Sequence, residues 1–346
     1  MLLSDRGSAA PTSGHIGEPV QAAVSTRYGS PDILEIREVA KPEPKADEVL
    51  VRVHATTVSR TDRGMLRADP FIVRFFFGLL RPKRSVLGVD FAGEVEAIGA
   101  GVSSFKPGQR VFGMSHWVYG AHAEYLNVPE NGPIATMPAG LRFEQAVVCE
   151  GAGYADMILK AFNLTAGDKI LIYGASGAIW TAALQLAKCY GAKVTAVVAT
   201  RHLELVKSLG ADRAVDYTAE DFTQIGETFD CVLDAVGKTS YFRCRRLLKS
   251  DGVFASSDLG PWCQVPLLAI WSRVTGSNRV VFPTSPGGKR LVEFLRDRME
   301  AGEFRAVIDR RYPLAAIADA YRYVDSMQKT GIVVINVTSD DNGGQA

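Results

Sequence analysis

The chain has 346 residues, a length that corresponds to about two domains. Hydrophobic residues make up 47% of it and charged residues 22%, which is typical of a globular protein and excludes wholesale disorder. Because 39 Lys and Arg residues nearly balance 38 Asp and Glu residues, the net charge of +1 provides no overall field for nucleic acid or an anionic membrane, and we expect neither partner.

The first residues lack the apolar core of a signal peptide, since Asp5, Arg6 and several Gly, Ser and Pro residues interrupt them. We expect residues 1–19 to be a disordered leader and the protein to be cytoplasmic. The longest apolar runs, such as Val265–Trp271, are too short to span a bilayer. The five cysteines are widely spaced without a CxxC pair, which predicts reduced thiols rather than a zinc cluster.

Between Val20 and Pro138 the sequence has the character of short strands separated by Gly, Pro and Asn. Glu48–His54 alternates in the manner of a half-buried strand, and Gly88–Gly99 and Gln109–Phe112 have the same pattern. This succession predicts a small β-barrel-like domain.

After Leu141 the periodicity changes. Short apolar runs at Lys169–Tyr173, Val194–Ala199 and Phe229–Asp234 alternate with helical stretches. Such alternation predicts right-handed crossovers and a parallel, doubly wound sheet.

Near Gly287 the pattern shifts again, and we expect the last part of the chain to return to the first domain. The elements expected there are a helix over Lys289–Ala301, a strand over Phe304–Asp309, a helix over Leu314–Ser326 and a strand over Ile332–Val337.

A glycine-rich turn directly follows the first strand of the expected parallel sheet and opens a helix, the context of a dinucleotide-binding turn. Its predicted cofactor-binding residues are Gly174, Ala175, Ser176, Gly177, Ala178 and Ile179. Trp180 stands at the last position of this fingerprint, where Gly or Ala normally lets the helix pack on the strand. The indole requires either a displaced helix or a ring that turns into the cofactor space.

The second strand of this sheet ends at Thr200 and Arg201, where an NAD-specific site would carry an acidic residue. A neutral residue followed by a cation suits a 2′-phosphate, and Tyr217 could flank the same phosphate. The alternative is that Arg201 merely begins a surface helix. We therefore expect NADP as the cofactor.

With these residues in place, the chain resembles the zinc-free branch of the medium-chain dehydrogenase/reductase superfamily, the quinone oxidoreductase-like proteins. The resemblance spans about residues 20–337 and rests on the motifs Tyr28–Glu35, Gly88–Glu94, Lys106–Phe112, Gly120–Tyr125, the turn with the following Gln185–Lys188, and Asp234–Gly237.

The resemblance implies an α/β fold in which a GroES-like β-barrel catalytic domain, residues 20–145 and 285–346, contains an inserted doubly wound Rossmann domain, residues 146–284. An active cleft is expected between the two. The resemblance also implies that Val236 and Gly237 border the cofactor, and that the protein is a homodimer joined by Rossmann edge strands.

Comparison with the zinc-dependent branch of the superfamily predicts that no metal is bound. The first ligand of that branch is replaced by Ser59 and the second by Val89, while the third position falls near Glu150. Valine cannot bind zinc, and serine is a poor ligand beside the usual thiolate and imidazole set.

Hydride transfer needs a donor for the oxyanion that develops on the acceptor. The predicted catalytic residues are Ser59, Arg60, Asp62, Glu150, Tyr154 and Asp156. Tyr154 replaces a small hydroxyl residue that lies beside the nicotinamide in the family. Asp62 could instead cap a helix, and Glu150 could be a solvated residue at a helix start.

The segment Phe71–Leu80 is the most apolar one that looks exposed, and the basic Arg81–Arg84 follows it. We expect a lid that shapes a pocket for a bulky apolar or aromatic small molecule. The alternative is a membrane-surface patch, which the balanced charge of the chain disfavours.

Two functions remain open. The first is a zinc-independent, NADP(H)-dependent reductase of enone or quinone acceptors, in secondary metabolism. The second is a redox-silent member of the same family, in which Trp180 and Tyr154 block the cofactor groove and the cleft performs a cyclisation, isomerisation or elimination.

Overall fold

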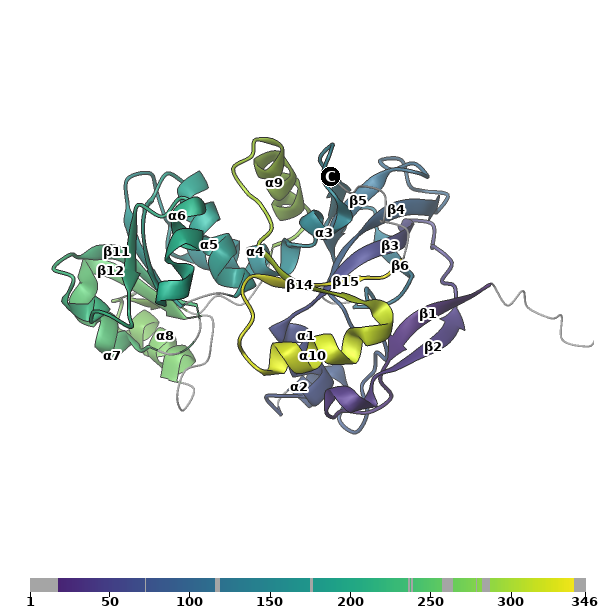
Figure 1. Ribbon diagram of the computed structural model, residues 1–346, viewed down its shortest axis with the longest axis horizontal. Helices are drawn as coiled ribbons and strands as arrows, with labels where there is room; N and C mark the ends of the chain where they lie inside the picture. Colours follow the sequence, from purple (N-terminus) through teal and green to yellow (C-terminus); the bar gives the residue numbers. More distant parts are fainter. Residues whose placement is uncertain are drawn as a thin grey trace, which may run out of the picture.

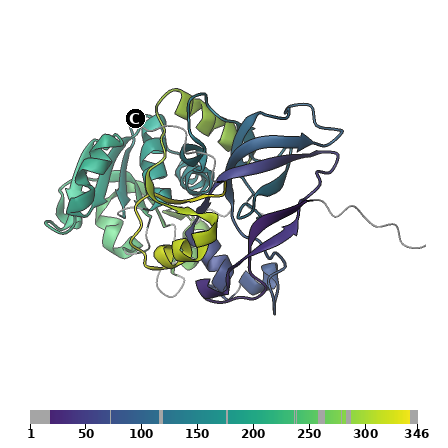
Figure 2. The same ribbon diagram turned by 45° about the vertical axis from the view of Figure 1, so that its right-hand side comes forward.

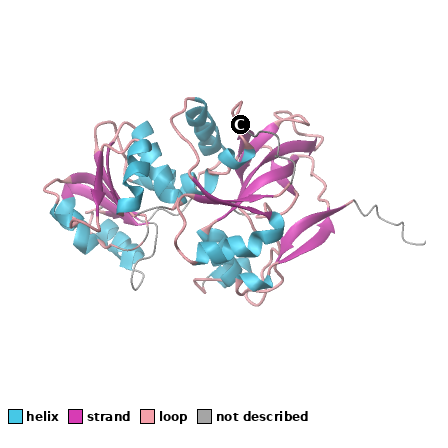
Figure 3. Cartoon of the chain, in the orientation of Figure 1, coloured by secondary structure: helices cyan, strands magenta, loops and turns pink. Residues whose placement is uncertain are grey.

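The computed structural model describes residues 18–71, 73–115, 119–174, 177–235, 237, 239–256, 264–277, 279–281 and 287–338. Two lobes lie side by side, one built mainly on antiparallel strands and the other on a parallel sheet flanked by helices (Figures 1 and 3). The C-terminal strands join the first lobe rather than the second (Figures 1 and 2). The fold class expected from the sequence is therefore confirmed, whereas the residue boundaries of the two domains stay a prediction.

The strands of the first lobe are β1 (Pro19–Val24), β2 (Glu35–Ala40), β3 (Glu48–Val58), β4 (Asp90–Ile98), β5 (Arg110–Met114), β6 (Tyr125–Pro129), β7 (Ile134–Thr136), β14 (Ile308–Pro313) and β15 (Ile332–Asn336). Its helices are α1 (Arg60–Arg67), α2 (Val73–Phe77), α3 (Phe143–Ala146), α9 (Lys289–Glu300) and α10 (Ile317–Asp325), and α4 (Cys149–Ala161) lies between the lobes (Figure 1).

The strands of the second lobe are β8 (Lys169–Tyr173), β9 (Lys193–Val198), β10 (Arg213–Asp216), β11 (Phe229–Asp234), β12 (Leu248–Ser256) and β13 (Val280–Val281). Its helices are α5 (Ala178–Cys189), α6 (Leu203–Ser208), α7 (Tyr241–Cys244) and α8 (Gln264–Val274). Pro19 belongs to β1 although it lies inside the segment expected to be a leader, whose residues 1–17 lie outside the described ones.

Strand β3 organises the first lobe because it is long, rich in β-branched residues and almost wholly buried. Within the described residues the sheet has the order β14-β15-β3-β4-β5-β7, and β6 also pairs with β3. The antiparallel partners Val333 and Val58 join β15 to β3, which fixes the C-terminal segment against the N-terminal lobe.

The parallel sheet has the order β10-β9-β8-β11-β12-β13 within the described residues. Its central strand β8 is apolar and pairs on both sides, so that Ile172 lies opposite Ala196 on one neighbour and Leu233 on the other. Strands of this kind are buried on both faces by helices, which explains their continuous apolar sequence.

One expected strand is displaced along the chain. The sequence predicted a strand over Phe304–Asp309, whereas β14 covers Ile308–Pro313. The reason is a side chain: Gln185 on α5 accepts a hydrogen bond from the Arg305 backbone N–H at 2.9 Å and donates one to the Arg305 carbonyl at 3.2 Å. These bonds satisfy the backbone there without a sheet neighbour.

Trp180 is buried in the main hydrophobic core, with 1% of its surface exposed, and does not turn into the cofactor space. Ala183 and Ala187 are also fully buried and follow it at the spacing of one helix face, so that small residues leave room for the indole. Its ring nitrogen Nε1 finds no hydrogen-bond partner among the described residues. The expectation that this ring could occupy the groove is wrong.

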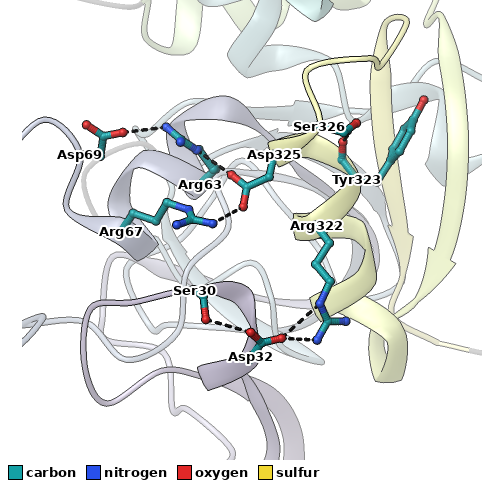
Figure 4. A network of polar contacts seen from close by, with 9 residues as sticks. All are labelled: Ser30, Asp32, Arg63, Arg67, Asp69, Arg322, Tyr323, Asp325 and Ser326. Atoms are coloured by element: carbon teal, nitrogen blue, oxygen red, sulfur yellow. Dashed lines mark hydrogen bonds and ion pairs between the residues drawn. The ribbon is translucent and has the colours of Figure 1, made fainter.

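An ion-pair cluster fastens α10 to α1 (Figure 4). Arg63 Nε donates to the Asp325 carboxylate at 2.7 Å, and Arg67 donates to its other oxygen. Partial burial raises the pKa of Asp325, but the hydrogen bonds from both guanidinium groups outweigh it and hold that pKa below its usual range. On the same helix, Arg322 pairs with Asp32 near the N-terminus of the chain.

No helix in the described ranges is long and apolar enough to cross a membrane.

We predict that Trp180→Ala lowers the free energy of unfolding by about 3–5 kcal/mol, because it leaves a large cavity in a closed core. Urea denaturation followed by circular dichroism measures the change. The control is Trp271→Ala on α8, where 60% of the indole is exposed and the cost should stay within about 0.5 kcal/mol. Equal costs for the two variants would contradict the burial of Trp180.

Candidate active site

A cleft lies where the two lobes meet. Its walls come from the start of α1, from α4, from the turn before α5, and from the segment that follows α10. The residues that line it are Ser59–Thr61, Glu150, Gly151, Tyr154, Gly174, Gly177–Ile179, Ala235, Val324, Met327 and Lys329. The cleft thus brings the glycine-rich turn together with four of the six predicted catalytic residues: Ser59, Arg60, Glu150 and Tyr154.

The glycine-rich turn has the backbone that an anion-binding turn requires. Gly174 has a φ of +120°, a conformation that favours glycine. Gly177 precedes α5, and a Cβ added to it would meet nothing within 4 Å, so the approach to the N-terminus of the helix is open. Ala175 and Ser176 lie outside the described residues. Backbone N–H groups and the helix dipole at this point suit a pyrophosphate.

Helix α4 packs closely against the same turn. A Cβ added to Gly151 would lie 2.8 Å from the Cβ of Ala178, so only glycine allows this contact between α4 and the start of α5. The close approach sets the width of the cleft, because Glu150 and Tyr154 lie on α4 and project from the wall that Gly151 positions.

The C-terminal segment also reaches the turn. Gly331 forms a single parallel bridge with Gly177, and its φ of +72° lies in the left-handed region. A Cβ on Gly331 would come within 1.9 Å of the Val307 carbonyl oxygen, so no side chain fits. Two residues earlier, Lys329 donates a hydrogen bond from Nζ to the Gly331 carbonyl at 2.7 Å, which holds its ammonium group beside the turn.

Lys329 is a buried cation in the cleft wall, with 9% of its surface exposed. Burial lowers its pKa to about 8; Glu150 on α4 and Asp309 on β14 oppose this effect, and Arg60 on α1 adds to it. An amine with such a pKa exchanges a proton near neutral pH, which an exposed lysine does not. The sequence analysis missed this residue, because an isolated lysine in a polar turn between a helix and a strand carries no motif.

Tyr154 is the phenol of the cleft. Burial and the neighbouring Glu150 raise its pKa to about 12, while a hydrogen bond with the Thr61 hydroxyl opposes the shift. The phenol therefore stays protonated at neutral pH and can donate a hydrogen bond. Among the residues expected from the sequence, Tyr154 has the environment that best suits an oxyanion donor.

Asp62 does not line the cleft but caps α1. Its carboxylate accepts hydrogen bonds from the Ser59 backbone N–H at 2.9 Å and from the Ser59 hydroxyl, which completes a capping box, and from the Gly88 backbone N–H at 3.1 Å. Burial raises its pKa to about 6. These hydrogen bonds are those of a helix cap, which was the alternative role predicted for Asp62 from the sequence.

Asp90 is a second buried carboxylate, and it holds the start of α4. Its Oδ1 accepts a hydrogen bond from the Glu150 backbone N–H at 2.7 Å. Burial raises the pKa of Asp90 well above its usual value, and the charge of Glu150 adds to the shift. Glu150 is buried rather than solvated. Val89 lies in the core, and the described part of the chain contains no group of three His, Cys, Asp or Glu side chains arranged to hold a metal ion.

Asp156 does not reach the cleft. Its carboxylate accepts a hydrogen bond from the Tyr190 hydroxyl and another from Lys160 at 2.7 Å, both on the side of α4 that faces α5 and solvent. The expected proton-transfer role is therefore not available to it. The error came from its position in the sequence: two residues along a helix from Tyr154, a side chain points to a different face.

The expected 2′-phosphate site has mixed electrostatics. Arg201 and Tyr217 are exposed at the carboxyl ends of β9 and β10. The Thr200 hydroxyl, however, donates to the Asp216 carboxylate at 2.6 Å, which places a negative charge against the residue that precedes Arg201. Gly237 donates its backbone N–H to Asp234 at 2.9 Å, while Val236 lies outside the described residues.

Comparisons with known proteins agree with this architecture. A model of the alcohol dehydrogenase GroES-like domain matches residues 45–139, and a model of the zinc-binding dehydrogenase family matches residues 209–335. The chain is 32% identical to the 2-methylene-furan-3-one reductase of Solanum lycopersicum, over 96% of this chain and 84% of the relative. It is 31% identical to the chloroplastic NADPH-dependent alkenal/one oxidoreductase of Arabidopsis thaliana, over 92% and 80%.

Among solved structures, the quinone oxidoreductase from Coxiella burnetii superimposes with a TM-score of 0.81, at 25% identity, over 93% of this chain and 100% of that one. The chain belongs to the medium-chain dehydrogenase/reductase superfamily, in its quinone oxidoreductase-like family. It is accordingly an enzyme of the oxidoreductase class.

We predict that the stability of Asp62→Asn relative to the wild type increases as the pH rises from 4 to 7. The folded-state pKa of Asp62 is raised to about 6, so its stabilising contribution is complete below the unfolded pKa and is lost as the pH passes through 6. Asparagine does not ionise, and the difference in stability should change by roughly 2 kcal/mol across this pH range. Urea denaturation of both proteins across this range tests it, and a constant difference would contradict the buried ionisation.

Proposed function

We propose that the protein is a zinc-independent, NADP(H)-dependent reductase of conjugated carbonyl compounds, of the enone or quinone type. The observation that carries the proposal is the composition of one cleft. It joins an open anion-binding turn, Gly174 and Gly177, to two protonated donors, Tyr154 and Lys329. A reduction of this kind adds a hydride and a proton to the acceptor, and the cleft offers a place for each.

The acceptor class is supported by relatives that are named for alkenals, alkenones, quinones and a methylene-furanone. Their shared feature is a carbonyl conjugated to a C=C bond, on which an oxyanion forms when the far carbon accepts a hydride. Apolar Ile179, Val324 and Met327 line the cleft together with the donors. Such a wall suits a largely apolar acceptor with one polar end.

NADPH is the proposed reductant because Arg201 follows β9 where an NAD-specific enzyme would place an acid. Gly174, Gly177 and the N-terminus of α5 would hold the pyrophosphate, and Arg201 with Tyr217 the 2′-phosphate. The carboxylate of Asp216, which binds Thr200, repels that phosphate. The preference for NADPH over NADH therefore depends on the attraction by Arg201 being stronger than the repulsion by this one carboxylate. When bound, the nicotinamide supplies the hydride.

The chain itself supplies the proton and the oxyanion donor. Tyr154, held by Thr61, donates a hydrogen bond to the carbonyl oxygen of the acceptor, where negative charge develops. The Lys329 ammonium gives a proton to the carbon next to the carbonyl of an enone, or to an oxygen of a reduced quinone, and the neutral amine recovers a proton from water. Burial lowers the pKa of Lys329 to about 8, and the charges of Glu150 and Asp309 oppose a larger shift. The amine is therefore mostly protonated at pH 7 yet able to release its proton.

The redox-silent alternative loses its main support because Trp180 lies in the core. Tyr154 does line the cleft, but the turn and the N-terminus of α5 remain open beside it. No observation favours a cyclisation or isomerisation over reduction.

We predict that the purified protein oxidises NADPH only when an alkenone or a quinone is added, and oxidises NADH more slowly at the same concentration. Absorbance at the nicotinamide band measures both rates. The matched control is Gly177→Glu, which places a carboxylate in open space at the phosphate position and should abolish turnover while leaving the melting temperature unchanged. No acceptor-dependent oxidation by folded wild-type protein, across both acceptor types, would overturn the proposal.

We predict that Lys329→Met lowers kcat by about 10²-fold or more, the size of a general-acid contribution. In the wild type, kcat should fall as the pH rises through about 8, because the protonated amine is the active form, and this limb should vanish in the variant. Lys329→Arg separates two roles, since arginine keeps the charge but does not release a proton near neutral pH.

Failure of arginine to restore kcat, with an unchanged KM for NADPH, supports proton transfer by Lys329. Full rescue by arginine, or an effect of Lys329→Met confined to the KM for NADPH, would show instead that the residue only binds the cofactor.

A further inference from the structure

The segment Phe71–Arg84 carries an apolar surface that the cleft does not use. Phe71, Phe75, Leu79 and Leu80 expose 61%, 66%, 55% and 85% of their surface. None of these side chains lines the cleft, so the lid expected from the sequence has no support in the structure. We call these four residues the apolar ridge.

Contacts with the first lobe anchor the segment that carries the apolar ridge. Phe77 packs edge-on against Tyr119 with ring centroids 5.8 Å apart, and the Tyr28 hydroxyl donates to the Gly78 carbonyl at 2.8 Å. Arg74 lies over the rings of Tyr28 and Phe71, at 4.9 and 5.2 Å from their centroids. The segment therefore presents its apolar side chains to solvent while its other side is anchored in the first lobe.

The charge of this segment is strongly one-sided. Between Pro70 and Arg84 the sequence contains Arg74, Arg81, Lys83 and Arg84 and no acidic residue. Arg81, Lys83 and Arg84 are exposed and directly follow the ridge. The balanced charge of the whole chain, which argues against a membrane partner, conceals this local excess of four cations.

We propose that the apolar ridge, together with the exposed cations Arg81, Lys83 and Arg84 that follow it, docks the protein on the surface of an anionic lipid bilayer. Apolar side chains that protrude at this exposure insert into the boundary between headgroups and acyl chains, and cations beside them attract anionic headgroups. A second copy of this chain fits less well, because a two-fold contact through the ridge would bring the four cations against four identical ones. The proposal does not depend on which acceptor the cleft reduces.

The experiment is co-sedimentation of the full-length protein with vesicles of phosphatidylcholine alone or mixed with phosphatidylglycerol, at low and high salt. We expect binding to the mixed vesicles, weakened by salt, and little binding to phosphatidylcholine alone. The variant Leu79→Ser/Leu80→Ser should reduce the partition coefficient by about tenfold or more, and Arg81→Ser/Arg84→Ser should weaken the salt-dependent part, because it removes two of the four cations.

The matched control is Ile270→Ser/Trp271→Ser on α8, which removes two apolar side chains of similar exposure, 63% and 60%, from the other lobe. It should bind vesicles as the wild type does, and circular dichroism melts confirm that all variants fold. The proposal is overturned if the wild type does not bind the mixed vesicles, or if the ridge variant and the α8 variant behave alike. It is also overturned if sedimentation velocity shows that the ridge variant dissociates a dimer, which would assign the surface to a second copy.

Discussion

The cleft depends on a contact between two backbones, at Gly177 and Gly331. Gly331 has no room for a Cβ, and its partner Gly177 precedes helix α5, whose N-terminus is the proposed phosphate site. This bridge joins the residue before β15 to the turn before α5 in the second lobe, although β15 itself belongs to the first. Any bulk at Gly331 would separate the lobes at the point where Lys329 and the turn must meet.

A second contact fixes the opposite wall, where Gly151 touches Ala178. The two close approaches involve the adjacent residues Gly177 and Ala178 at the start of α5, so the width of the cleft is set by backbone rather than by flexible side chains. Helix α10 is in turn fastened to α1 through Asp325 and its two arginines. The walls that carry Arg60, Tyr154 and Lys329 are thus positioned by these backbone contacts and by the ion pairs between α10 and α1.

The electrostatics of the cleft are determined by ionisable groups that are buried and whose charged forms are only partly compensated by their neighbours. Asp62 and Asp90 lie behind the wall and satisfy backbone N–H groups, which is why they cap helices rather than face substrate. Burial raises the pKa of both carboxyls and lowers that of Lys329, and in each case it favours the neutral form. A group that is close to balance between its two forms is suited to moving a proton.

The sequence was sufficient for the fold class, because alternating periodicities identify a barrel and a parallel sheet without knowledge of contacts. It also located the turn at Gly174 and the predicted catalytic residues that line the cleft, which are Ser59, Arg60, Glu150 and Tyr154. It failed where the answer depends on three-dimensional neighbours. Asp156 points to Tyr190, and Lys329 enters the cleft only because β15 returns to β3.

Trp180 shows why a departure from a fingerprint does not by itself imply a lost cofactor site. The small residue at that position serves the packing of helix on strand, whereas the cofactor contacts come from the glycines before it. A larger side chain at this position therefore has to be accommodated by packing in the core. Buried Ala183 and Ala187 on the same helix face provide the space. The approach to Gly177 remains open while the indole fills the interior. Packing and binding at this turn are separable, and a substitution that looks like occlusion in the sequence is accommodated behind the binding surface.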